Sequence, residues 1–180
     1  MSYNAPSVKA TLTQHEIYSL VAADLVRVEE ELEGYSKSSV GPISDIGRYL
    51  IEAGGKRVRP ALLLLTARML GEVSPSTIRM AAVVELIHNA TLVHDDVIDS
   101  SDTRRGRPSA NTQWGNAMTV LAGDWLYMQS FAVAIEEKSF DVLTTLIGIT
   151  QKMVEGELLQ LTVLGRSDVS AQQLLDIAER

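Results

Sequence analysis

The segment from Met80 to Asp99 constrains the fold of this chain more than any other part of the sequence. Its residues follow the 3.6-residue period of an α-helix and are almost wholly apolar as far as His88. A helix that is apolar over so much of its surface must be covered by other elements. The same period prevails along the rest of the chain, without the alternating pattern of strands and hairpins. The sequence therefore predicts an all-helical protein in which this helix is deeply buried.

Local signals predict where the helices begin and end. Thr13 and Glu16 have the spacing of a capping box, which would open the first helix. Pro60 is expected to be the first residue of a helix that ends at Gly71, and Ser74 precedes the long apolar helix. The predicted helices span about residues 13–32, 42–53, 60–70, 75–99, 113–136, 139–163 and 170–180.

Three glycines, Gly115, Gly123 and Gly156, lie inside predicted helices. Each costs roughly 1 kcal/mol relative to Ala in a helix interior. Close packing of another element against these positions is the preferred explanation.

Composition limits the classes of protein that the chain can belong to. It has 180 residues, of which 46% are hydrophobic, enough for one domain with a sizeable core. No apolar run is long enough for a transmembrane segment and the first residues do not form a signal peptide, so we expect a soluble, cytoplasmic protein. The absence of cysteine excludes disulfides and thiolate metal sites. A net charge of −7 argues against general nucleic-acid binding.

Asp95, Asp96 and Asp99 form a cluster of carboxylates at the end of the long helix. Asp95 and Asp99 are four residues apart and share one helix face, where two like charges cost roughly 0.2–0.5 kcal/mol. Magnesium would offset that cost, because it is usually held by one or two carboxylates together with substrate phosphate oxygens. Arg104 and Arg105, just downstream, are then candidates for the other half of a phosphate clamp.

The segment Gly54–Pro60 reads Gly-Gly-Lys-Arg-Val-Arg-Pro and stands directly before a predicted helix. Glycines let the backbone approach an anion, a helix start offers free N–H groups, and Lys56, Arg57 and Arg59 add positive charge. These features indicate a diphosphate site, although the spacing of a P-loop is missing. A basic surface turn is an equally good interpretation of this segment by itself.

His88 lies two helical turns before Asp95, about 10 Å away and on nearly the same face. It is either a ligand at the same site or a buried core residue, and the pattern does not decide between the two. Ala90 and Thr91 lie one turn below Asp95, so a ligand that extended down the helix would meet small side chains. That arrangement leaves room for a deep apolar channel.

Other interpretations of the carboxylates stay open at this point. The cluster could be a solvated acidic helix end that runs into a basic loop. His94 and Asp95 form the dipeptide of a metal phosphohydrolase, but such a site needs further histidines, and only His15 and His88 remain. The Asp-x-Asp-x-Asp-Gly spacing and the closing Glu of a calcium-binding loop are absent, which argues against that interpretation.

Taken together, the motifs at 54–60, 85–99 and 102–109 resemble those of the trans-isoprenyl diphosphate synthases. The likeness is strongest to their long-chain branch, the octaprenyl, heptaprenyl and solanesyl diphosphate synthases. It covers nearly the whole chain and extends through Gly123–Asp124 and Gly156–Leu161. The resemblance implies an isoprenoid synthase-type bundle of long antiparallel helices around a central cavity. It also implies a Mg²⁺-dependent prenyltransferase that adds isopentenyl diphosphate head-to-tail to an allylic prenyl diphosphate.

The same resemblance assigns roles to individual residues. Asp95 and Asp99 would coordinate Mg²⁺ that grips the allylic diphosphate, Asp96 would support them, and Arg104 would contact the same diphosphate. Small residues at Ala90 and Thr91 would allow a long, lipophilic product. The residues that match the isopentenyl diphosphate site of the family are Lys56, Arg59, His88 and Arg105.

The chain departs from the family pattern in one respect. The second aspartate-rich motif and further lysines of the family have no counterpart, and the last predicted helix stops at Arg180. We therefore expect a single incomplete domain over residues 1–180, with a flexible segment at 1–12, without the C-terminal helices and without normal turnover. Its exposed apolar faces would favour association, and the resemblance implies a homodimer.

Two alternatives to the enzyme remain. A terpene cyclase shares the aspartate-rich helix, but it needs an aromatic-lined pocket, and aromatic residues make up only 5% of this chain. It would also have no use for Lys56 and Arg59. The second alternative is a non-catalytic helical subunit or fragment that acts through dimerisation.

Overall fold

The computed structural model describes residues 12–71 and 73–180. The predicted flexible segment at 1–12 therefore lies, apart from Leu12, outside the described residues. The chain forms two compact units, the first ending at Val133 and the second running from Ala134 to Arg180. The prediction of one domain stays a prediction.

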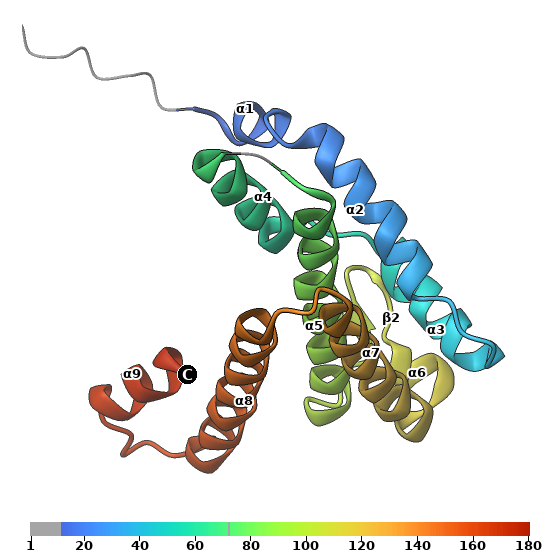
Figure 1. The fold of residues 1–180 in the computed structure, drawn as a ribbon. Coiled ribbons are helices and arrows are strands. Elements are labelled where there is room, and N and C mark those ends of the chain that lie inside the picture. Colours follow the sequence, from blue (N-terminus) through green and yellow to red (C-terminus); the bar gives the residue numbers. More distant parts are fainter. Residues whose placement is uncertain (1–11, 72) are drawn as a thin grey trace, which may run out of the picture. The chain divides into compact units, whose positions relative to one another are not determined.

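Helices make up nearly all of the described structure, as predicted (Figure 1). The exception is a short β-hairpin between α5 and α6, whose two strands have two residues each. The sequence pattern did not predict this hairpin. The elements are α1 (Gln14–Ser19), α2 (Ala22–Tyr35), α3 (Gly41–Glu52), α4 (Val58–Leu70), α5 (Pro75–Ile98), β1 (Thr103–Arg104), β2 (Arg107–Pro108), α6 (Ala110–Trp114), α7 (Asn116–Glu136), α8 (Phe140–Val163) and α9 (Ala171–Glu179).

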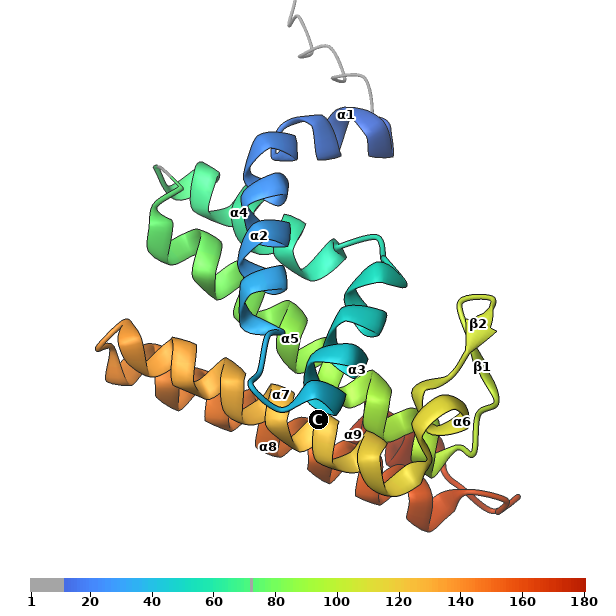
Figure 2. The ribbon, with the colours of Figure 1, turned by 90° about the vertical axis from the view of Figure 1, so that its right-hand side faces the viewer.

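Helix α5 is the centre of the first unit, with α2 and α4 both packed against it (Figures 1 and 2). The deep burial that its apolar sequence predicted is confirmed, because most of its inward side chains have almost no exposed surface. The buried cluster combines residues of α5 with residues of the neighbouring helices: Val21, Val28, Leu32, Ala61, Leu64, Ile78, Ala81, Ala82, Leu86, Ala90 and Leu126. This core fixes α5 as a rigid support for the residues at its C-terminal end.

The capping box at the start of the chain is confirmed, but the helix that it opens is shorter than predicted. Glu16 N donates to Thr13 Oγ1 at 3.3 Å, and Thr13 N donates to Glu16 Oε2 at 2.7 Å. The prediction of one helix to residue 32 is wrong, because α1 ends at Ser19. Val21 leaves helical geometry, with φ −123° and ψ 11°, and its side chain is fully buried in the core. The chain therefore changes direction to bury Val21 and continues as α2.

Two further boundaries differ from the prediction. Helix α4 begins at Val58, so Pro60 is its third residue, where a missing N–H still costs no helical hydrogen bond. The predicted helix over 113–136 is broken at Gly115, whose φ of 79° favours glycine and ends α6. Gly115 is therefore a helix terminus and not a packing residue. The end of α4 at Gly71 and the cap of α5 at Ser74 are confirmed.

In the second unit, α8 and α9 lie against each other. A Cβ atom on Gly156 would be 3.5 Å from Ile177 O and from Arg180 Cβ, so α9 passes close to this position. None of the helices in the described residues is both long and apolar enough to cross a membrane.

Candidate functional site

A cavity of about 420 Å³ in the first unit brings together residues from three separate parts of the sequence. They come from the loop before α4, from the middle of α5 and from the turn of the β1–β2 hairpin. The lining residues are Gly55, Lys56, Arg57, Val58, Arg59, Glu85, His88 and Arg105. All four residues that the family resemblance assigned to isopentenyl diphosphate, Lys56, Arg59, His88 and Arg105, are among them.

The loop before α4 is held in an unusual conformation. Gly54 has φ 66° and Arg57 has φ 50°, which lies in the left-handed region. For a residue with a Cβ atom this region costs roughly 1–2 kcal/mol, so the surrounding contacts must stabilise it. From α1, the hydroxyl of Tyr18 donates to the carbonyl of Lys56 at 2.7 Å. These constraints leave Lys56 and Arg59 exposed on either side of Arg57.

Arg57 is buried and does not act as a third free cation of the loop. Its Nε and Nη2 donate to Glu29 at 2.5 Å and 3.0 Å, and its Nη1 donates to Glu85 at 3.0 Å. Burial opposes the charge of Arg57, but the hydrogen bonds and negative charges of Glu29 and Glu85 raise its pKa. Of the three cations of this loop, only Lys56 and Arg59 are therefore left as candidates to face an anion.

Sequence reasoning missed Glu29 and Glu85 as parts of the site. Glu85 is the only charged residue between Met80 and Val93, and it is 2% exposed. A buried acidic residue in an apolar run usually has a basic partner, so this signal was available in the sequence. Glu29 gave no such signal, because it lies in a run of acidic residues on α2.

The hairpin directs its two arginines to different partners. Thr103 pairs with Pro108 and Arg104 with Arg107, and the turn residues Arg105 and Gly106 both have positive φ. Tyr49 fixes the hairpin to α3, because its hydroxyl donates to the carbonyl of Pro108 at 2.6 Å. As a result, Arg104 reaches the end of α5, while Arg105 lines the cavity.

At Gly55 the loop lies close to the side chain of Arg105 from the hairpin. A Cβ atom there would lie 2.8 Å from Nη1 of Arg105 and 3.3 Å from Nη1 of Arg57. Any larger residue would displace these guanidinium groups. The second glycine of the motif is thus required by the approach of Arg105.

His88 lines the cavity and is only half-buried, so it is not a fully enclosed core residue. Burial and the positive charges of Arg59, Arg105, Arg104 and Arg57, in that order, lower its pKa to about 4. The ring is therefore neutral at pH 7 and offers one N–H donor and one acceptor. A neutral donor beside several cations suits the oxygens of a diphosphate.

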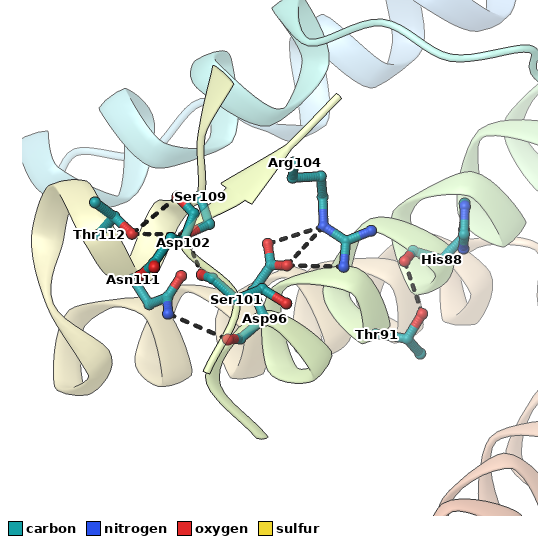
Figure 3. A network of polar contacts seen from close by, with 9 residues as sticks. All are labelled: His88, Thr91, Asp96, Ser101, Asp102, Arg104, Ser109, Asn111 and Thr112. Atoms are coloured by element: carbon teal, nitrogen blue, oxygen red, sulfur yellow. Dashed lines mark hydrogen bonds and ion pairs between the residues drawn. The ribbon is translucent and has the colours of Figure 1, made fainter. Parts of the chain in front are cut away.

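Asp96 pairs with Arg104 of the hairpin (Figure 3). It is 1% exposed, and both of its oxygens accept from Arg104 Nε, at 2.8 Å and 2.9 Å. Nη2 of Arg104 lies 2.8 Å from Asp96 Oδ1. The Asp96 carbonyl also accepts from Asn111 Nδ2 at 3.1 Å and from Ser101 N at 2.9 Å. Asp96 thus anchors the hairpin and its arginine.

Asp95 and Asp99 remain as candidate metal ligands at the end of α5. Asp99 is the C-cap residue and is exposed, whereas Asp95 is half-buried. Burial, and then the charge of Asp95, raise the pKa of Tyr127, so this phenol of α7 lies near the carboxylate. Within residues 12–71 and 73–180, no three acidic or histidine side chains converge to hold a metal. The pair therefore fits a cation such as Mg²⁺ only if substrate oxygens complete the coordination.

The interpretation of His94–Asp95 as a phosphohydrolase site is wrong. His94 Nε2 lies 3.2 Å from the carbonyl of Val120 and 3.4 Å from Asp124, and its ring stacks on Tyr127. A Cβ atom on Gly123 would be 2.4 Å from this nitrogen, which confirms close packing at that glycine. His94 therefore joins α5 to α7 and is not part of a histidine cluster within the described residues.

Ala90 and Thr91 differ in their surroundings. Ala90 is fully buried in the core cluster. Thr91 is half-buried, and its hydroxyl donates to the carbonyl of His88 at 2.7 Å (Figure 3). Their role in setting the length of a product stays a prediction.

Comparison with known proteins identifies the family. The sequence profile of the polyprenyl synthetase family matches residues 41–180. The chain belongs to the polyprenyl synthetase family. Among curated relatives, it is 40% identical over 146 residues to the octaprenyl diphosphate synthase of Haemophilus influenzae, a match that covers 81% of this chain and 44% of that protein.

Two solved structures of the family confirm the predicted fold class. A decaprenyl diphosphate synthase from Rhodobacter capsulatus is 38% identical, with a TM-score of 0.88 over 92% of this chain and 51% of that one. A polyprenyl synthase from Caulobacter crescentus, solved with calcium and isoprenyl diphosphate, is 37% identical, with a TM-score of 0.86 over 89% of this chain and 49% of that one. The chain thus spans about half the length of the polyprenyl synthetases that it matches.

Proposed function

We propose that this chain carries the substrate-binding residues of a long-chain polyprenyl diphosphate synthase. Such an enzyme adds isopentenyl diphosphate head-to-tail to an allylic diphosphate and gives an all-trans polyprenyl diphosphate. The observation that carries the proposal is the cavity in which Lys56, Arg59, His88 and Arg105 meet. These residues come from three motifs that are distant in the sequence, so their convergence is not a consequence of local composition.

In this proposal the cavity holds the diphosphate of isopentenyl diphosphate. Lys56, Arg59 and Arg105 supply positive charge, and charge-assisted hydrogen bonds to phosphate are roughly twice as strong as neutral ones. His88 contributes a hydrogen bond from its imidazole ring, which faces the same cavity. Arg57 adds little charge, since Glu29 and Glu85 neutralise it.

The allylic diphosphate would bind at the end of α5. Asp95 and Asp99 would hold Mg²⁺, which when bound stabilises the negative charge that develops on the departing diphosphate. Asp96 would keep Arg104 beside this site, so that the guanidinium can contact the same diphosphate. Preorganised cations of this kind act without reorganising at the moment of reaction.

The reaction begins when the allylic carbon–oxygen bond breaks and the electron pair leaves with the diphosphate. The double bond of isopentenyl diphosphate then attacks the allylic cation, and a proton is lost from the condensed product. We further propose a long product, because Thr91 is too small to block a chain that grows along α5 and Ala90 is buried in the core cluster.

Isothermal titration calorimetry tests the two sites separately. Isopentenyl diphosphate should bind to the chain without Mg²⁺, and Lys56→Ala should weaken that binding. Farnesyl diphosphate should bind only when Mg²⁺ is present. Asp95→Asn should abolish this Mg²⁺-dependent binding. Incubation of the chain with both substrates, one labelled, then measures whether any polyprenyl product forms.

The outcomes of this experiment decide between the candidates. Failure of the chain to bind either diphosphate would overturn the proposal. Binding of both without product fits the expected incomplete catalyst. Long products from this chain itself would show that the aspartate cluster at 95–99 suffices for catalysis.

We also propose that the chain forms a homodimer. Large apolar side chains on α8 are exposed, among them Phe140, Ile149, Val154 and Leu158. Exposed apolar surface of this extent favours association with a partner. Light scattering after size exclusion measures the mass in solution. Self-association without binding of either diphosphate would favour the non-catalytic alternative.

A further inference from the structure

Arg57 is the most constrained side chain of the candidate isopentenyl diphosphate site. Its side chain is 8% exposed and joins two helices, with Glu29 on α2 and Glu85 on α5 as its ion-pair partners. Three hydrogen bonds leave from its three guanidinium nitrogens. Only a planar guanidinium can serve two carboxylates from two directions in this way, because a lysine ammonium lacks the fork.

The neighbours of Arg57 in the chain are the residues that line the cavity. Lys56 precedes it, Arg59 follows two residues later, and both are exposed. The Arg57 carbonyl accepts from Ala61 N at 3.0 Å and so starts the hydrogen bonding of α4. The position of Arg57 therefore sets both the direction of the loop and the start of the helix that carries Arg59.

We propose that Arg57, held by Glu29 and Glu85, is a positioning residue that fixes Lys56 and Arg59 at the isopentenyl diphosphate site without binding the diphosphate itself. This inference rests on the proposed function of the cavity. The left-handed backbone at Arg57 supports it, because such a conformation persists only where surrounding contacts over-determine it. Glu29 does not line the cavity, and its carboxylate accepts two hydrogen bonds from Arg57, so a contact effect of Glu29 on binding would pass through Arg57.

The substitution Glu29→Gln separates a positioning role of Arg57 from direct binding of the diphosphate, because the two roles predict opposite changes in affinity. If Arg57 bound the diphosphate, Glu29→Gln would remove a competing negative charge and tighten the binding. If Arg57 positions the loop, the same substitution loosens the loop and weakens the binding. The sign of the change therefore separates the two roles.

The experiment compares Glu29→Gln with Glu30→Gln in the 180-residue chain, by calorimetric titration with isopentenyl diphosphate without Mg²⁺. Both substitutions remove one negative charge from α2, but Glu30 is exposed and takes no part in the Arg57 contacts. We expect Glu29→Gln to raise the dissociation constant about ten- to a hundredfold, the range for residues that orient a binding group. Glu30→Gln should change it less than about twofold, as expected for a distant screened charge.

Arg57→Lys, with Arg68→Lys as its matched control, provides the second measurement. Arg68 also pairs with a carboxylate of α2, Asp24, at 2.6 Å, but lies away from the cavity lining. Only Arg57→Lys should weaken the binding of isopentenyl diphosphate, and Mg²⁺-dependent binding of farnesyl diphosphate should stay as in the unchanged chain. Circular dichroism checks folding, and if Arg57→Lys does not fold, the comparison at Glu29 decides.

The results distinguish this inference from the proposed function beneath it. If the unchanged chain does not bind isopentenyl diphosphate, the proposed function of the cavity fails and the positioning role fails with it. If the unchanged chain binds but Glu29→Gln binds equally well or more tightly, the positioning role alone is overturned. Loss of both ligands by Glu29→Gln, in step with loss of helicity, would also overturn it, since the contact between Glu29 and Arg57 would then serve general stability.

Discussion

The Asp96–Arg104 ion pair gives a quantitative prediction, because its partners are buried to different degrees. The side chain of Asp96 is 1% exposed and that of Arg104 is 29% exposed. Arg104→Ala would leave a buried carboxylate without its cation, which costs about 3–5 kcal/mol in such pairs. Asp96→Ala would leave a guanidinium that can still reach water, so about 1–2 kcal/mol is expected. The two substitutions should thus destabilise the first unit unequally.

The double variant measures the interaction itself. With both charges removed, no buried group is left unpaired, so the double variant should be no less stable than Arg104→Ala. The coupling energy should then be about 2 kcal/mol, within the usual range for residues in contact. Urea denaturation followed by tryptophan fluorescence reports this, because Trp114 in α6 and Trp125 in α7 both lie in the first unit.

Asp99→Ala is the matched control at the same end of α5. Asp99 is exposed, so its replacement should change the free energy of unfolding by less than about 0.5 kcal/mol. A coupling energy below about 0.5 kcal/mol between Asp96 and Arg104, or equal losses for the two single variants, would refute the reasoning.

Three further predictions concern the glycines and the histidine of the first unit. Gly55→Ala should leave stability nearly unchanged but weaken isopentenyl diphosphate binding about tenfold in a calorimetric titration, because its Cβ displaces a guanidinium of the cavity. Gly123→Ala should lower the free energy of unfolding in urea by about 1–2 kcal/mol, because its Cβ would overlap the ring of His94. Gly148→Ala on α8 is the control: its Cβ would meet no atom, so it should raise the free energy of unfolding slightly. His88 has a pKa of about 4 in the folded chain and 6.5 in the unfolded chain, so the unfolded chain binds more protons between these values. Stability should therefore fall as the pH drops from about 6.5 to 4. If a His88→Gln variant loses as much stability over that range as the unchanged chain, the lowered pKa of His88 is contradicted.

Much of the fold could be read from the sequence where one local signal was strong enough. The apolar period of α5, the capping box at Thr13, the helix start at Ser74 and the glycine stop at Gly71 each act within a few residues, and all are confirmed. The break at Val21 could not be read in this way. Val21 fits a helix by its own propensity, and only the core that buries it decides that the chain turns there.

The same distinction between local signals and tertiary packing applies to the candidate site. The sequence determined which chemical groups the site contains, because the spacing of carboxylates on a helix and of cations before a helix is a local property of the chain. Only the tertiary structure decided which of those groups face a ligand and which face one another. By sequence, Arg57 adds charge to the loop and Asp96 belongs to the carboxylate cluster, yet each is buried against opposite charges from other elements. The reason is physical: a buried charge must be paired, and the partner is chosen by packing between segments that are far apart in the chain.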